Sequence, residues 1–145
     1  MSSGDFEIGW PDVGFKKSDQ KLYQDLINKD SKTPFSGLLM SEVFIYAMTL
    51  GYNDGKRNPF EEKERLPNMP PNAFSSEMRW LMRTISITEE EDLEHIVNHS
   101  KVIKTAEEYA NRGIQIIREL DIESGKTYQR DAPYQSHLNE VVNNQ

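Results

Sequence analysis

The stretch LLMSEVFIYAMTLGY, from Leu38 to Tyr52, decides the fold of this chain. Only Ser41, Glu42 and Thr49 are clearly polar in it, so apolar side chains point to all sides of a helix. The stretch is shorter than the roughly 18 apolar residues that a membrane-spanning helix needs. We therefore expect the buried central helix of a small domain, packed on several sides.

The flanking residues set the expected ends of this helix. Pro34 and Ser36 precede it, and Gly51 stands where a left-handed residue ends a helix, so we expect the helix to stop there. A strand over residues 43–46 is the alternative, but the length of the run and the stop signal favour a helix.

Composition limits the possible functions. The chain has 145 residues, enough for one domain that buries about two-thirds of its unfolded surface. It has no cysteine, which excludes disulfides, thiolate metal sites and a cysteine nucleophile. The formal net charge of −7 weighs against non-specific nucleic-acid binding, which needs a basic surplus. No signal-peptide pattern opens the chain, so we expect a cytoplasmic protein.

The chain divides into an extended arm (1–17), a helical domain (18–123) and a polar tail (124–145). In the arm, Phe6, Ile8 and Trp10 alternate as in a half-buried strand, and glycines and a proline disfavour a helix. We expect the aromatic side chains to lie on the body of the domain, although a partner surface could equally receive them. After Glu123 the apolar period is lost, and we expect a frayed or partner-dependent tail.

Two further helices and one loop are predicted around the central helix. Ser18 opens the first helix, over SDQKLYQDLINKD, and another runs from Ser75 or Ser76 to Ile85. Between them, residues 60–71 are charged and then proline-rich, which indicates a surface loop with a short helical turn at residues 61–65. No convincing pair of interior strands is present. We therefore predict an all-α, or nearly all-α, compact bundle of four to five helices.

The last predicted helix is the longest. Thr88, followed by three glutamates, is a helix-start signal, and the apolar period continues to about Leu120. This region could be one helix of about thirty residues or two helices joined near residues 98–100. Ala106, Ala110 and Gly113 place small side chains on one face, so we expect a neighbouring helix to approach closely there.

Catalytic and metal-binding chemistry has little support. His95 and His99 are four residues apart in HIVNH, a spacing that could hold a metal, but the sequence lacks the glutamate of HExxH and a third ligand. The glutamates at 89–91 are explained by the helix dipole, and Glu107 and Glu108 by a solvated face. We expect no catalytic residue, metal or cofactor, and no enzyme activity.

Five residues are candidates for contact with a partner protein or with DNA. Lys56 and Arg57 follow the central helix, and Arg79 and Arg83 share a helix face. Trp10 is the fifth, because it belongs to the aromatic arm. For the basic residues, acidic neighbours make a solvated surface of mixed charge the preferred interpretation.

Two segments resemble a known family. FSGLLMSEVFIYAMTLGYNDGKRNPF (35–60) and TAEEYANRGIQIIREL (105–120) are similar to signature segments of the small DNA phosphorothioation-associated protein 4 of Dnd gene clusters. The resemblance covers roughly residues 20–121 and leaves out the arm and the tail. It implies a cytoplasmic role beside phosphorothioate DNA modification or its linked restriction, and it assigns no catalytic residue.

Three functions follow as hypotheses. The first is a non-enzymatic adaptor of this phage-defence system that binds other proteins of the system. The second is a DNA-binding protein of the ribbon–helix–helix type, or a DNA-binding subunit of the same system, with residues 6–10 as the ribbon. The third is a small hydrolase or metal-dependent nuclease, which would need a bound metal.

Overall fold

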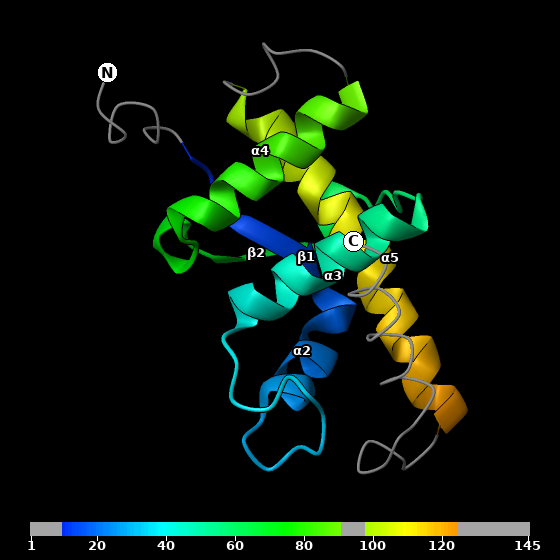
Figure 1. Ribbon diagram of the computed structural model, residues 1–145. Coiled ribbons are helices and arrows are strands. Elements are labelled where there is room, and N and C mark those ends of the chain that lie inside the picture. Colours follow the sequence, from blue (N-terminus) through cyan, green and yellow to red (C-terminus); the bar gives the residue numbers. More distant parts are fainter. Residues whose placement is uncertain (1–9, 91–97, 125–145) are drawn as a thin grey trace.

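The computed structural model describes residues 10–90 and 98–124, which form four α-helices and one small antiparallel sheet (Figure 1). In chain order the elements are β1 (Val13–Lys16), a 3-10 turn (Lys17–Asp19), α2 (Gln20–Ile27), α3 (Met40–Asp54), a 3-10 turn (Glu62–Glu64), β2 (Arg65–Met69), a 3-10 turn (Pro71–Ala73), α4 (Ser76–Glu90) and α5 (His99–Ser124). Helix α5 packs on α3, α4 and β1, and α2 packs on α3. No helix within the described ranges is long and apolar enough to span a membrane.

Helix α3 is the expected central helix, but the predicted stop at Gly51 is wrong. The helix continues to Asp54 and ends at Gly55, whose φ is 80°. The Gly55 N–H donates to the carbonyl oxygens of Gly51 and Tyr52, as at a left-handed helix end. Gly51 lies inside the helix and is buried. This position therefore serves helix packing rather than helix termination.

The close approach predicted for Ala106, Ala110 and Gly113 is confirmed at the crossing of α3 and α5. A Cβ atom on Gly113 would lie 1.7 Å from the carbonyl oxygen of Ala47, and one on Gly51 would lie 1.9 Å from that of Tyr109. The two backbones therefore touch at a pair of glycines. Ala106 and Ala110 are buried on the same helix.

The bundle is mainly helical, as expected, but it is not purely so. Strand β1 pairs antiparallel with β2, with Phe15 opposite Leu66 and an irregularity between residues 13 and 15. The predicted turn is present as a 3-10 turn at 62–64, but the residues after it form a strand rather than a loop. Pro67 within β2 makes this strand hard to predict from the sequence. Proline has no N–H to donate, so a strand tolerates it only where no backbone hydrogen bond is required.

The boundary between the last two helices also differs from the expectation. Thr88 lies in the last turns of α4, and its hydroxyl donates to the Thr84 carbonyl oxygen at 2.9 Å rather than capping a new helix. Helix α5 begins at His99, and the side-chain oxygen of Asn98 accepts from the Lys101 N–H at 3.1 Å. A helix start at Thr88 and a single helix from there onward are therefore both wrong. The break expected near residues 98–100 coincides with the start of α5 at His99.

The described part of the arm packs onto the body. Trp10, Val13 and Phe15 are buried, and the Phe15 ring stacks on Tyr23 of α2 at 4.1 Å between centroids. Phe6 and Ile8 lie outside the described residues, as do residues 125–145 of the predicted tail. The first helix begins two residues later than predicted, at Gln20.

Candidate functional site

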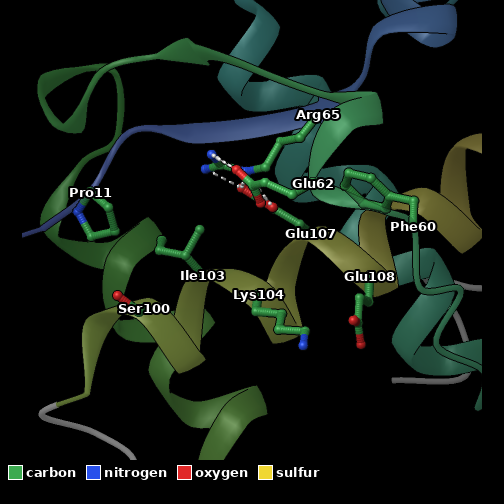
Figure 2. Close-up of a pocket in the computed structure, with 9 residues that line it drawn as sticks. All are labelled: Pro11, Phe60, Glu62, Arg65, Ser100, Ile103, Lys104, Glu107 and Glu108. Atoms are coloured by element: carbon green, nitrogen blue, oxygen red, sulfur yellow. Dashed lines mark hydrogen bonds and ion pairs between the residues drawn. The ribbon is translucent and has the colours of Figure 1, made fainter.

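A pocket of about 390 Å³ lies between residues 60–65, the chain that enters β1 and the first turns of α5 (Figure 2). This volume is at the lower end of the range of about 300–1,000 Å³ for ligand pockets. Its wall consists of Pro11, Phe60, Glu62, Arg65, Ser100, Ile103, Lys104, Glu107 and Glu108.

Glu107 connects α5 to both strands of the sheet. Its carboxylate accepts hydrogen bonds from Nε and Nη2 of Arg65 at 2.9–3.1 Å and from the Gly14 N–H at 2.8 Å. Burial raises the pKa of Glu107, although the hydrogen bonds from Arg65 and Gly14 act in the opposite direction. Glu107 is 5% exposed and Glu108 is 6% exposed, so the predicted solvated face is wrong for both. The segment at 57–65 crosses α5 here and supplies their arginine partners.

Glu108 belongs to a second group, which joins α4 to α5. Its Oε1 atom accepts from Nε and Nη2 of Arg57 at 3.0 and 2.8 Å. The same guanidinium lies 3.5 Å from Glu89 of α4 and 5.9 Å from the ring centre of Tyr109. The Tyr109 hydroxyl donates to Glu89 at 2.7 Å. One arginine is thus shared by two carboxylates.

The polar residues that follow on α5 hold the end of α3 and the segment after it. Asn111 donates from Nδ2 to the Asn58 carbonyl oxygen at 2.8 Å, and the Asn58 N–H donates to the carbonyl oxygen of Glu108 at 3.1 Å. Arg112 pairs with Asp54 at 2.8 Å. Residues 107–112 of α5 therefore use most of their polar side chains to fix neighbouring elements.

The family model described as DNA sulphur modification system-associated protein 4 matches residues 13–135. The chain belongs to this family. The match is wider than the resemblance at residues 20–121, since it takes in strand β1 and part of the predicted tail. Comparisons with curated proteins and with solved structures found no match.

The structure places two of the five predicted contact residues of this DNA sulphur modification system-associated protein in its interior. Arg83 is fully buried, and its guanidinium carbon lies 4.8 Å from the ring centres of both Trp10 and Trp80. Trp10 is 5% exposed and Trp80 is 45% exposed. This cation–π contact fixes the described start of the arm to α4.

Of the other three predicted residues, one is exposed and two are half-buried. Lys56 is exposed just after α3, whereas Arg57 belongs to the group around Glu108. Arg79 donates from Nη1 to the Pro71 carbonyl oxygen at 3.0 Å. A partner or DNA contact at these positions stays a prediction.

Only His99 of the histidine pair belongs to the described residues, because His95 lies outside them. The ring of His99 lies 5.1 Å from that of Trp10. Within residues 10–90 and 98–124, no group of three or more histidine, aspartate and glutamate side chains is arranged to hold a metal ion.

The pocket residues were missed from the sequence, although one signal for them exists. Glu107 falls in the same helical phase as Ile103, Ala110, Ile114 and Ile117, which are all buried. A carboxylate on an apolar stripe predicts a buried charge with a partner. The identity of that partner, Arg65, depends on the strand β2 that was not predicted.

Proposed function

We propose that this protein is a non-enzymatic adaptor of a DNA sulphur modification system, in the cytoplasm, where it binds other proteins of the system in phage defence. Membership of a family named for association with such a system supports a role beside the modification chemistry. The observation that carries the proposal is the use of the charged residues of α5. Glu107, Glu108 and Arg112 pair with residues of other elements, so they maintain a fold rather than surround a reacting group.

The ion pairs also weigh against DNA as the main partner. Arg57, Arg65, Arg112 and Arg118 each pair with a carboxylate of the same chain. An arginine that is held by a carboxylate offers less charge to a phosphate, and phosphate neutralisation dominates DNA affinity. The net charge of −7 acts in the same direction.

One observation favours the alternative, a DNA-binding protein of the ribbon–helix–helix type. The order β1, α2, α3 is strand, helix, helix. However, β1 pairs with β2 of its own chain, and the side chains of Val13 and Phe15 are buried. A strand that reads a DNA groove must present its side chains to the bases.

Affinity capture from a native host tests the adaptor function. The tagged full-length protein, captured under mild conditions, is expected to recover products of the neighbouring modification or restriction genes. A tagged Gly113→Leu variant, in which the contact between α3 and α5 is disrupted, is the control for non-specific capture. Recovery of no such product by a folded wild-type bait would count against the adaptor function.

A mobility-shift titration tests the alternative. Duplexes with and without phosphorothioate links are titrated at low salt, where electrostatic binding is strongest. The adaptor function predicts no retarded complex. A complex that dissociates steeply with salt would favour DNA binding instead.

A further inference from the structure

We propose that the pocket beside α5 receives an arginine or lysine side chain from a basic segment of a partner protein. This inference rests on the proposed adaptor function and names where and how the partner is recognised. The pocket has room for one long side chain, and its apolar walls, Phe60 and Ile103, suit the methylene groups of such a side chain (Figure 2).

The charges around the pocket are not balanced. Arg65 lies 2.9 Å from Glu107 and 3.6 Å from Glu62, so one guanidinium serves two carboxylates. Arg57 is shared in the same way, by Glu108 and Glu89. Among the residues that line the pocket, three are acidic (Glu62, Glu107 and Glu108) and two are basic (Arg65 and Lys104), which leaves an excess of one negative charge on its wall.

Glu108 is the group that a cation would meet inside the pocket. Its side chain is 8% exposed and lines the pocket. Oε1 accepts both bonds from Arg57, whereas Oε2 has no hydrogen-bond partner within the part of the chain that the structure describes. A guanidinium or ammonium that reached this oxygen from the pocket would gain a charge-assisted hydrogen bond.

Lys104 determines the expected response to mutation. It is exposed on α5 and forms no ion pair with any described residue. The ammonium of Lys104 repels a second cation that enters the pocket, whereas the exposed carboxylate of Glu62 attracts that cation. Lys104→Glu should therefore tighten binding of a basic side chain, and Glu62→Gln should weaken it.

An NMR titration of the labelled full-length protein tests this inference. The probe is the blocked tripeptide acetyl-Gly-Arg-Gly-amide, with norleucine and glutamate tripeptides as matched controls. We expect saturable shifts for the amides of Phe60, Ile103 and Glu108 with the arginine peptide alone. The titration extends to about 20 mM, twentyfold above a millimolar dissociation constant. Lys104→Glu should lower the dissociation constant about threefold, and Glu62→Gln should raise it about twofold.

Three results would overturn the inference. They are the absence of saturable shifts at the pocket, equal shifts with the glutamate or norleucine peptide, and an unchanged affinity in both variants. Both changed residues are exposed, so the variants are expected to fold, and their amide spectra check this directly.

Capture experiments separate this inference from the adaptor function. If wild type and Glu62→Gln recover the same partner equally well while the arginine peptide does not bind, the adaptor function stands and the pocket is not its recognition site. If the peptide binds at the pocket but no partner is captured from the host, the pocket accepts a basic side chain and the adaptor function fails.

Discussion

Replacing Gly113 by alanine tests the contact between α3 and α5 on which the fold depends. The added Cβ would lie 1.7 Å from the carbonyl oxygen of Ala47, whereas ordinary contact begins at 3.4 Å. The difference, 3.4 minus 1.7, means that the two backbones must separate by about 1.7 Å. Because the obstacle is backbone, no side-chain rotation relieves it.

The magnitude follows from two opposing effects. Alanine stabilises a helix interior by about 1 kcal/mol relative to glycine. Overpacking costs typically about 1–3 kcal/mol, and we take the upper end because both sides of this contact are backbone. The net loss in the free energy of unfolding is therefore about 2 kcal/mol. For a domain of this size, Tm should fall by about 4–8 °C.

Thermal melts followed by circular dichroism measure this loss, with Glu119→Ala as the control. Glu119 is exposed on the same helix, so its replacement should change stability by at most about 0.5 kcal/mol. Gly51→Ala meets the Tyr109 carbonyl oxygen at 1.9 Å and should behave like Gly113→Ala. The double variant should lose less than the sum, because both changes open the same contact. A Gly113→Ala protein that melts at or above the wild-type Tm would refute the reasoning.

Four further predictions concern the charged network, a helix end and the cation–π contact. Arg65→Ala should lower the free energy of unfolding by about 3–5 kcal/mol in urea titrations, since it leaves the buried Glu107 carboxylate uncompensated. Burial raises the pKa of Glu107 in the folded protein above its ordinary 4.5, so this group stabilises the fold fully below pH 4.5 and the stabilisation is lost as pH rises through the folded-state pKa. Glu107→Gln should therefore flatten the decline in the free energy of unfolding that wild type shows as the pH is raised above 4.5. Gly55→Ala should cost about 1–2 kcal/mol, because φ is 80° at the end of α3, and a Tm equal to wild type would contradict this. Trp80→Ala removes one face of the Arg83 contact and should cost about 1 kcal/mol in the same titrations, whereas an unchanged midpoint would show that the outer ring contributes nothing.

The central helix and its small-residue contact were predictable because they depend on local periodicity. Apolar residues on all sides of residues 38–52 required a buried helix, and Ala106, Ala110 and Gly113 required a close neighbour. The role of Gly51 was not predictable. A glycine near the end of an apolar run fits a helix end as well as a helix crossing, and the crossing partner Tyr109 is 58 residues away in the chain.

The sheet and the pocket depend on long-range contacts that the pattern does not encode. Strand β2 contains Pro67, and its partner β1 lies about fifty residues earlier, so neither shows the alternation of an independent hairpin. In the sequence, Glu107 and Glu108 look like solvated residues. Their burial is understood only when the fold places Arg65 and Arg57 beside them. Two of the residues predicted as contacts also have partners that are far away in the chain. Arg57 pairs with Glu108, and Trp10 meets Arg83 only because the arm passes beside α4.

Reconstitution with the proteins encoded beside it in a host genome tests the adaptor function most directly. The purified full-length protein is mixed with each neighbouring modification or restriction protein and analysed by size-exclusion chromatography with light scattering. The adaptor function predicts co-elution with at least one of them, at a fixed stoichiometry and without added DNA. Separate elution from every folded neighbour, in the presence and absence of the others, would contradict it.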